Sequence, residues 1–269
     1  MLSFNKRYFV MNTLKVITVI VLILTVNGIY GKLSYSKTNA TNWLVIGGFP
    51  ARDGQYPYQV SLRNPSDNRH FCSGSIVRLY WVLTAGHCVD NRNSSSVVIV
   101  VGTNHLDENG TKYEVSNIVL HEEYNGYPNY TNDIALLKIR KRISYSSKVR
   151  PVSLGNINIA ASTSCTLSGW GFTTSSSLLY PNELQHVTLT TISNIQCQEA
   201  LYPYSIQTSN LCTYENGKRA CNGDSGSPLM CRGQQHGIVS WGKNCNEGNP
   251  DVYTNVPYYR EWIRNKTGA

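Results

Sequence analysis

Hydrophobic positions from Tyr58 onward fall in short runs, several of which alternate with polar positions. The runs are rich in Val, Ile, Tyr and Thr, and clusters of Gly, Pro, Asn and Ser separate them, which is typical of β-strands between turns. The clearest runs cover residues 58–62, 81–83, 97–101, 134–139, 187–192 and 237–241. Many short strands with little helix predict an all-β fold, either a barrel or a sandwich.

The clearest helical pattern lies near the end of the chain, over residues 257–266, where Pro257 suits a first helical turn. The strand pattern covers two halves of similar character, and we expect the division between them near residues 150–158. The body is long enough to bury a substantial core, in one domain or in two small halves.

The N-terminal segment has the pattern of an export signal. Residues 16–26 are almost purely aliphatic and follow several basic residues. These 11 residues fall short of the roughly 20 that a membrane-spanning helix needs. Small residues follow at Gly28 and Gly31, so residues 1–30 are predicted to be a cleaved secretory signal peptide. The alternative is a retained membrane anchor. We expect a secreted, extracellular protein with no membrane association once the signal is removed.

The net charge of +8 is concentrated at the N-terminus. Five basic residues and no acidic residue lie in the first 44 positions, which leaves 19 basic against 16 acidic groups in the rest of the chain. A net charge of +3 on the body is too weak to indicate a nucleic-acid partner. The composition is that of an ordinary globular protein and excludes wholesale disorder, collagen-like repeats and coiled coils.

Eight cysteines follow the predicted signal, and export favours disulfides among them. Eight cysteines allow 105 pairings, and the spacing alone does not choose one. The sequence contains neither a Cys-x-x-Cys pair nor a His-Glu-x-x-His motif, so no metal site is predicted. Sequons in the expected mature chain predict glycosylation on surface loops; they lie at Asn93, Asn109, Asn129 and Asn265.

Three short motifs contain residues that can take part in catalysis. They are Leu-Thr-Ala-Gly-His-Cys at 83–88, Asn-Asp-Ile-Ala-Leu-Leu at 132–137 and Gly-Asp-Ser-Gly-Ser-Pro at 223–228. Taken singly, His87 could be a buried histidine, Asp133 a strand cap and Ser225 a turn serine. Taken together they suit nucleophilic catalysis, because a serine hydroxyl needs a base and the base needs an orienting carboxylate. Neighbouring backbone N–H groups could stabilise an oxyanion.

In this His, Asp, Ser order the chain resembles the chymotrypsin-fold (trypsin-like) serine proteases. The resemblance extends from residue 45 through the C-terminal helix and includes Val-Ile-Gly-Gly at 45–48, Ser-Gly-Trp-Gly at 168–171 and Ile-Val-Ser-Trp-Gly at 238–242. It implies an all-β, chymotrypsin-like fold of two six-stranded antiparallel β-barrels with a C-terminal helix and the triad between the barrels. It also implies Ser225 as nucleophile, His87 as general base and then acid, and Asp133 as the orienting carboxylate.

The same resemblance assigns the surrounding positions. Gly223 and Ser225 would supply the oxyanion-hole N–H groups, and Ser240 would also hydrogen-bond the catalytic aspartate. The positions implied to bind substrate are Arg219, Ala220, Asn222, Ser240, Trp241, Gly242 and Asp251. The disulfides implied are Cys72–Cys88, Cys165–Cys231, Cys197–Cys212 and Cys221–Cys245. No cofactor is implied, and no calcium site either, because Thr103 stands where calcium-binding members carry Glu.

Activation by proteolysis is a further implication. Residues 31–44 would be a short propeptide and residues 45–269 the protease domain, with the new amine of Val45 pairing with Asp224. The residue before the junction is Leu44 rather than Lys or Arg. We therefore expect an activator that cuts after Leu or a neighbouring aromatic residue, and the enzyme itself is a candidate.

The floor of the specificity pocket departs from the family pattern, with Arg219 at one floor position and Asp251 at the other. A buried pair between them is favoured, because a paired ion costs less than two isolated buried charges. Such a shortened, neutral pocket would suit Leu, Phe or Tyr. The alternatives are an exposed Asp251 that selects basic residues and a free Arg219 that selects acidic ones.

The leading interpretation is a monomeric, secreted endopeptidase made as a zymogen, similar to arthropod chymotrypsin-like proteases of gut or venom. Its expected partners are protein or peptide substrates, an activating protease and protein inhibitors. One alternative is a catalytically dead homologue used for binding, although all three triad residues are present. Another is an esterase or toxin of the same fold with a narrow macromolecular target.

Overall fold

The computed structural model describes residues 46–128, 130–174, 179–243, 245 and 248–268. The predicted signal peptide and propeptide, the Leu44–Val45 junction and the Asn129 sequon lie outside these residues. The chain divides into two units at residues 42 and 43, and the described residues all belong to the second.

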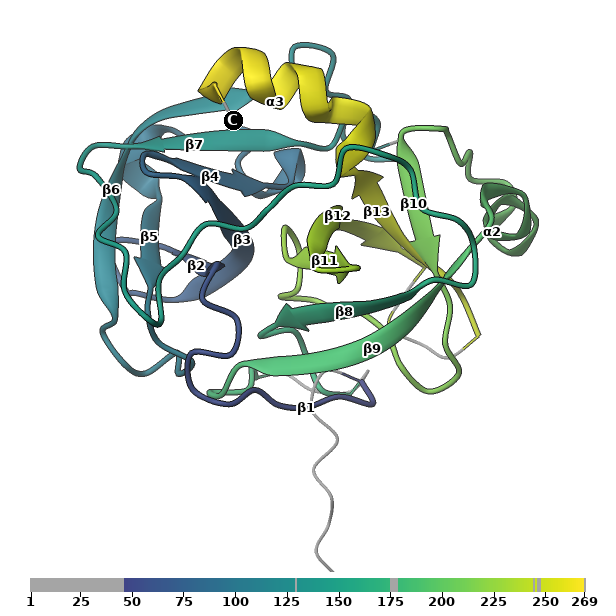
Figure 1. Ribbon diagram of the computed structural model, residues 1–269, viewed down its shortest axis with the longest axis horizontal. Coiled ribbons are helices and arrows are strands. Elements are labelled where there is room, and N and C mark those ends of the chain that lie inside the picture. The colour runs from purple at the N-terminus through teal and green to yellow at the C-terminus, as the bar shows by residue number, and fades with distance from the viewer. Residues whose placement is uncertain (1–45, 129, 175–178, 244, 246–247, 269) are drawn as a thin grey trace, which may run out of the picture. The chain divides into compact units, whose positions relative to one another are not determined.

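Two closed, six-stranded antiparallel barrels form the body of the protein, as the resemblance implied (Figure 1). The first has the order β2-β3-β4-β7-β6-β5. Its strands are β2 (Gln59–Arg63), β3 (His70–Arg78), β4 (Trp81–Thr84), β5 (Val98–Val101), β6 (Thr111–Leu120) and β7 (Ala135–Ile139). The all-β prediction is therefore confirmed.

The second barrel has the order β9-β10-β13-β12-β11-β8 and closes through the pairing of β8 with β9. Its strands are β8 (Ser164–Gly169), β9 (Gln185–Ile192), β10 (Asn210–Thr213), β11 (Pro228–Cys231), β12 (Gln234–Gly242) and β13 (Asp251–Asn255). The short strand β1 (Phe49–Pro50) adds to the outer edge of β9.

Strand side chains alternate as the hydrophobic pattern predicted. In β9, every second residue from Gln185 onward is buried and the intervening residues are partly or fully exposed. Alternation follows from the two-residue period of a strand, which sends successive side chains to opposite faces. Strand β2 is buried at all five positions, because its outer face is also covered. The buried residues of β2 include the polar Gln59, Ser61 and Arg63, which the alternation did not predict.

Helices are few. Beside the short 3-10 turns η1 (Gly86–Cys88), η2 (Ser94–Ser96) and η3 (Val256–Tyr259), the described residues form α2 (Asn194–Leu201) and α3 (Arg260–Thr267). The predicted C-terminal helix exists, but the residues around Pro257 form η3 and the α-helix begins only at Arg260. Val256, Tyr259 and Ile263 of this segment are buried in the core of the first barrel, and Figure 1 shows α3 lying across the β7 side of that barrel.

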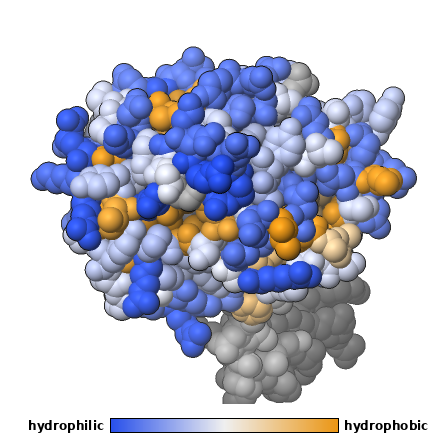
Figure 2. Space-filling view, turned by 45° about the horizontal axis from the view of Figure 1, so that its top comes forward, coloured by the Kyte–Doolittle hydropathy of each residue, from blue (hydrophilic) through white to orange (hydrophobic). Residues whose placement is uncertain are grey.

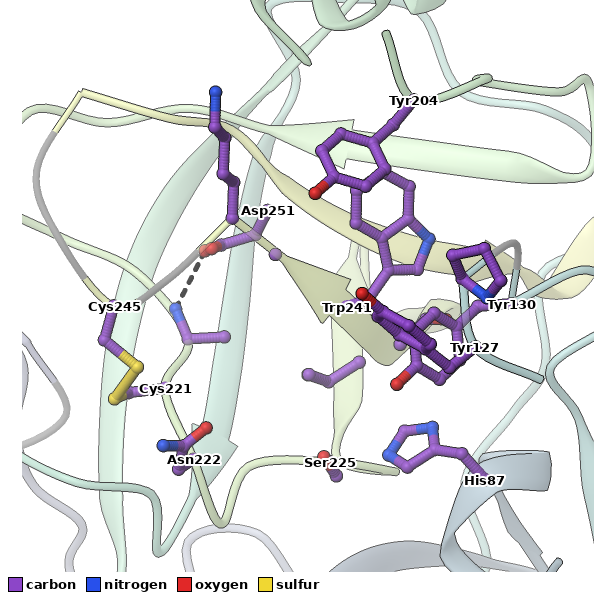
Figure 3. A pocket seen from close by; sticks show the side chains of 16 residues that line it. His87, Tyr127, Tyr130, Tyr204, Cys221, Asn222, Ser225, Trp241, Cys245 and Asp251 are labelled. Carbon is purple, nitrogen blue, oxygen red and sulfur yellow. Dashed lines mark hydrogen bonds between the residues drawn. A yellow bond between two sulfur atoms is a disulfide. The ribbon is translucent and has the colours of Figure 1, made fainter. Parts of the chain in front are cut away.

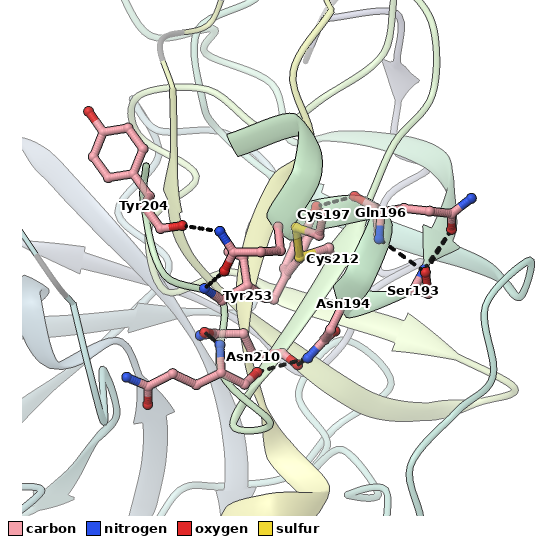
Figure 4. Close-up of a disulfide and its surroundings, with 12 residues drawn as sticks. Ser193, Asn194, Gln196, Cys197, Tyr204, Asn210, Cys212 and Tyr253 are labelled. Atoms are coloured by element: carbon pink, nitrogen blue, oxygen red, sulfur yellow. Dashed lines mark hydrogen bonds between the residues drawn. A yellow bond between two sulfur atoms is a disulfide. The ribbon is translucent and has the colours of Figure 1, made fainter. Parts of the chain in front are cut away.

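Helix α2 was missed by the hydrophobic pattern because it has little amphipathic character; only Cys197 and Leu201 are buried. Its N-terminus is instead fixed by a capping box, in which Ser193 and Gln196 satisfy each other's backbone N–H groups. The Cys197–Cys212 disulfide joins the helix to β10 (Figure 4). Gln198 then holds the following loop, because its side chain donates to the Tyr204 carbonyl and accepts from the Ile206 N–H.

All eight cysteines are paired in the structure. The disulfides are Cys72–Cys88, Cys165–Cys231, Cys197–Cys212 and Cys221–Cys245, the same pairs that the resemblance implied. The face shown in Figure 2 is mainly hydrophilic, with hydrophobic side chains gathered in a band across its middle. Within the described ranges, no helix is both long and apolar enough to cross a membrane.

Candidate active site

Strand pairing brings the histidine and aspartate motifs together. Strands β4 and β7 are neighbours in the first barrel, with Thr84 opposite Ala135. His87 lies in η1 just after β4, and Asp133 lies just before β7, so both emerge at the same end of this strand pair. The Cys72–Cys88 disulfide ties η1 to β3 beside His87. Ser225 comes from the other barrel, in the turn that precedes β11.

The side chain of Asp133 is fully buried, and both of its carboxylate oxygens accept hydrogen bonds. Its Oδ2 accepts from His87 Nδ1 at 2.8 Å, and its Oδ1 accepts from the His87 backbone N–H at 2.8 Å. Ser240 Oγ in β12 donates to Oδ2 at 2.5 Å. Because a carboxylate only accepts, His87 carries its proton on Nδ1 when neutral and leaves Nε2 free to take another.

The electrostatics of this pair suit a general base. Burial alone would lower the pKa of His87, but the charge and hydrogen bond of Asp133 outweigh it and the net pKa is raised. Burial alone would raise the pKa of Asp133, but His87 and the Ser240 hydrogen bond outweigh it and the net pKa is lowered. Asp133 therefore stays ionised while His87 gains basicity.

His87 and Ser225 line the same cleft, which has a volume of about 850 Å³ (Figure 3). No hydrogen bond joins these two side chains in the described part of the chain, although both face the cleft. Contacts of this kind often tighten only when substrate is bound. The cleft is in the size range of ligand sites.

Two backbone N–H groups beside Ser225 are available for an oxyanion. Within the residues that the structure describes, neither the Gly223 nor the Ser225 N–H donates a hydrogen bond, whereas those of Asp224, Gly226 and Ser227 do. Gly223 has φ of +100°, and a Cβ there would lie 2.5 Å from Tyr180 Cε1. Glycine is therefore required for this backbone conformation.

Asp224 is fully buried next to this turn. Its carboxylate accepts from the Gly171 N–H at 2.8 Å and the Cys221 N–H at 3.0 Å. It forms no ion pair with any residue that the structure describes. Burial raises its pKa to about 7 despite the two hydrogen bonds. The site thus contains a buried carboxylate that has no cationic partner among the described residues.

The expected ion pair at the pocket floor does not form. Asp251 lines the cleft, but its Oδ2 accepts from the Ala220 backbone N–H at 2.8 Å. Arg219 is 2% exposed, does not line the cleft and makes no contact of 4 Å or less with an acidic oxygen of a described residue. The prediction of a direct pair is therefore wrong: among the described residues, the donor to this carboxylate is the Ala220 backbone N–H, not the Arg219 guanidinium.

The Arg219 guanidinium has two buried nitrogens, Nε and Nη2, that find no hydrogen-bond partner among the described residues. Its charge still acts at a distance on Asp251. Burial raises the pKa of Asp251 to about 7, and the Ala220 hydrogen bond and the Arg219 charge oppose that rise. The carboxyl that faces the cleft therefore titrates near neutral pH rather than in the acidic range of a free aspartate.

The remaining substrate positions that the resemblance implied also line the cleft; they are Ala220, Asn222, Ser240, Trp241 and Gly242. Of the sequons, Asn93, Asn109 and Asn265 are exposed, so their glycosylation stays a prediction. His87 lies near the sulfurs of Cys72 and Cys88, but a disulfide carries no thiolate to bind a metal.

Sequence reasoning missed an aromatic wall along one side of the cleft. Tyr127, Tyr130 and Tyr204 line it together with Trp241 (Figure 3). The ring centroids of Tyr204 and Trp241 lie 5.6 Å apart, and those of Tyr130 and His87 lie 5.8 Å apart. The tyrosines at 127 and 130 were visible as a local cluster, whereas Tyr204 reaches the cleft only through the loop that Gln198 holds.

Comparisons with known proteins agree with this geometry. Residues 45–263 match the family model described as Trypsin. The chain is 38% identical to human "Serine protease 1" over 231 residues, which covers 84% of this chain and 90% of that protein. It is 40% identical to "Trypsin I-P1" of Gallus gallus, covering 82% and 88%, and 38% identical to "Chymotrypsin-2" of Vespa crabro, covering 82% and 98%. The chain therefore belongs to the trypsin family of serine endopeptidases.

Proposed function

We propose that this endopeptidase is secreted, is made as a zymogen and cleaves peptide bonds through Ser225, His87 and Asp133. The observation that carries the proposal is the buried Asp133–His87 pair, which opens onto a cleft that Ser225 also lines. Among the described residues, the N–H groups of Ser225 and of nearby Gly223 have no acceptor. The Leu44 junction and the N-terminal signal pattern remain sequence-based parts of the proposal.

In the proposed reaction, His87 Nε2 takes the Ser225 hydroxyl proton while Oγ attacks the substrate carbonyl carbon. The carbonyl oxygen becomes an oxyanion, which the N–H groups of Gly223 and Ser225 stabilise. His87 then gives its proton to the leaving amine, and an acyl-enzyme on Ser225 remains. Water, deprotonated by His87, hydrolyses that ester and restores the serine.

Substrate is proposed to lie along β12, where Ser240, Trp241 and Gly242 line the cleft. An extended peptide that pairs with a strand gains affinity from main-chain hydrogen bonds, with little demand on its own sequence. This mode suits protein and peptide substrates, and it suits protein inhibitors that present an extended loop. We propose that the enzyme acts as a monomer.

Activation is proposed to create a cation for Asp224. Cleavage after Leu44 would free the Val45 amine, and a buried carboxylate whose pKa is about 7 would gain stability by pairing with it. The Cys221 N–H donates to this carboxylate, so its position is coupled to the turn that carries Gly223 and Ser225. A single ion pair could therefore order the oxyanion hole.

Primary specificity is proposed to be mixed. The Ala220, Val239 and Trp241 side chains line the cleft and suit large apolar residues such as Leu, Phe or Tyr. Asp251 faces the same cleft, and its ionised form would accept a Lys or Arg side chain. With Asp251 titrating near neutral pH, the enzyme would cut after apolar residues and, more as the pH rises, after basic ones.

The test is a peptide-library digest with protein that begins at Val45, with Ser225→Ala as the control. Cuts after Leu, Phe or Tyr, joined by Lys or Arg at higher pH, are expected. Cuts mainly after Asp or Glu would refute the proposed pocket. Absence of cuts beyond the control, in disulfide-bonded protein, would favour a catalytically dead binding homologue. N-terminal sequencing of the processed protein tests the junction, and a terminus other than Val45 would refute it.

A further inference from the structure

Arg63, the last residue of β2, is a buried cation outside the triad. It has no exposed surface, and no acidic side chain lies within 4 Å of it among the described residues. Its Nη1 donates to the carbonyl oxygens of Leu106 at 2.8 Å and Glu108 at 3.3 Å, on the loop between β5 and β6. Burial lowers the pKa of Arg63, and the charge of Asp107 on the same loop only partly opposes that fall. A charged guanidinium is therefore costly to keep at this position.

A chain of hydrogen bonds runs from this cation to the turn that carries Ser225. Arg63 Nε donates to Ser61 Oγ at 3.0 Å, and Ser61 Oγ lies 2.9 Å from His70 Nδ1. His70 Nε2 lies 3.1 Å from the Gly223 carbonyl oxygen. Four residues from two strands of the first barrel and one turn of the second are thus joined in sequence.

The residues at the two ends of this hydrogen-bond series determine which group donates at each step. Arg63 can only donate, and the Gly223 carbonyl can only accept. Ser61 therefore receives from Arg63 and donates its own proton to His70 Nδ1, which leaves the His70 proton on Nε2 for the carbonyl. Every donor points toward Gly223. Hydrogen bonds aligned in this way polarise one another, and a charged first donor strengthens the next bonds.

The surroundings of His70 favour the neutral imidazole that this series of hydrogen bonds requires. His70 packs against the rings of Trp170 and Tyr180, at centroid distances of 5.5 and 5.4 Å. Burial lowers its pKa to about 4; the Gly223 hydrogen bond opposes that fall and the Arg63 charge adds to it. His70 is therefore neutral at neutral pH, with one ring N–H and one acceptor nitrogen, as the chain requires.

We propose that Arg63 is a positioning residue for the oxyanion hole, acting through Ser61 and His70 on the Gly223 carbonyl. Holding that oxygen fixes the backbone of Gly223, whose N–H is one of the two free donors, in its φ of +100°. The inference rests on the proposed function only in giving those donors their role. It also connects the surface loop of Leu106 and Glu108 to catalysis.

The test compares Arg63→Met, Ser61→Ala and the double variant, all in the mature protein. Removing one oxyanion donor outright costs roughly 100-fold or more in kcat, so loosening one is expected to cost about tenfold. KM should stay within about twofold, because the ground-state carbonyl depends less on these donors. The double variant should lose no more than the larger single loss, since both changes break one chain. Arg92→Met is the matched control. Arg92 is a partly buried arginine that donates a hydrogen bond to Asn64, and it takes no part in the hydrogen-bond series from Arg63 to Gly223.

A second measurement does not depend on activity. In the Ser225→Ala background, exchange of the His70 Nε2 proton with solvent is followed by NMR. Arg63→Met and Ser61→Ala should each speed this exchange about tenfold, whereas Arg92→Met should leave it unchanged.

The outcomes separate the two hypotheses. A parent protein that cleaves nothing refutes the proposed function. The exchange rate of the His70 Nε2 proton then still shows whether Arg63 and Ser61 hold His70 in place. Active parent protein with unchanged kcat in both single variants overturns the positioning role. Loss of kcat in Arg63→Met but not in Ser61→Ala also overturns it, because Arg63 would then act only as an anchor of the loop. If Arg63→Met does not fold, unchanged kcat in Ser61→Ala still overturns the proposal.

Discussion

Replacing Asp251 with asparagine should separate the two specificities of the cleft. Asp251→Asn keeps an oxygen that can accept from the Ala220 N–H and removes the titrating group. The wild-type carboxyl has its pKa raised to about 7, mainly by burial. Its neutral form therefore dominates below pH 7 and its charged form above.

The magnitude follows from that pKa. With a pKa of about 7, roughly a tenth of the carboxyl is ionised at pH 6 and roughly nine tenths at pH 8. A Lys or Arg side chain gains Coulomb energy only from the ionised form, whereas a Leu side chain gains none. The ratio of kcat/KM for an Arg substrate to that for a Leu substrate should rise about tenfold from pH 6 to pH 8.

The assay measures both substrates in one enzyme preparation, as peptides that differ only at the residue before the cut. Titration of His87 affects both rates alike and cancels in the ratio, so the ratio isolates the pocket. In Asp251→Asn the ratio should be low and independent of pH. A flat ratio in the wild type, or an equal rise in Asp251→Asn, would refute the reasoning.

Three further predictions follow from the same contacts. Arg219→Met should move the midpoint of that ratio to higher pH, because the Arg219 charge opposes the rise in the Asp251 pKa; a midpoint that stays or falls would contradict this. Gly223→Ala should lower kcat roughly 100-fold or more in folded protein, since a Cβ at this φ of +100° would meet the Tyr180 ring; unchanged kcat would argue against the assigned oxyanion hole. The uncleaved Ser225→Ala precursor should lose stability as the pH rises from about 4 to about 7, because the Asp224 pKa is raised to about 7 and the neutral acid is the better-tolerated form in the folded state. A shift of about three units corresponds to roughly 4 kcal/mol at most, and thermal melts of Ser225→Ala with and without Asp224→Asn measure it.

Much of the fold could be predicted from the sequence because strand burial is a local pattern. The runs at 81–83 and 187–192 correspond to β4 and β9 within one or two residues. Helix α2 could not be found in this way, because a capping box and a disulfide hold it rather than an apolar face. Pro257 marked a helical turn correctly, but that turn is η3 and the α-helix starts later.

The candidate triad could be proposed from the sequence because each chemical group stands in a distinctive local motif. The β4–β7 pairing places His87 beside Asp133, and the cleft brings Ser225 to the same site. The pocket floor was not readable, because its outcome depends on which backbone N–H reaches the carboxylate. Asp251 accepts from Ala220, and no pattern of side chains along the chain encodes that contact. Arg63 was invisible for a similar reason: its partners are carbonyl oxygens of a loop more than 40 residues away in sequence.

Three buried carboxyl groups of this site show how partners decide chemistry. Asp133, Asp224 and Asp251 are each at most 8% exposed, so burial disfavours the charge on all three. Only Asp133 has a histidine and a serine hydroxyl as donors, and only its pKa is lowered. Among the described residues, Asp224 and Asp251 accept from backbone N–H groups only, and the pKa of each rises to about 7.

The difference in pKa distinguishes Asp133, whose ionised form is favoured, from Asp224 and Asp251, whose charge depends on pH and on a nearby cation. An aspartate that orients the base must remain ionised, and the lowered pKa of Asp133 suits the role proposed for it. A carboxyl poised near neutrality changes state when a cation arrives, because a nearby positive charge stabilises its ionised form. The cation would be the new terminal amine for Asp224 and a substrate side chain for Asp251. Activation and specificity in this enzyme would then depend on the same physical feature, a buried carboxyl that forms no direct ion pair with any described residue.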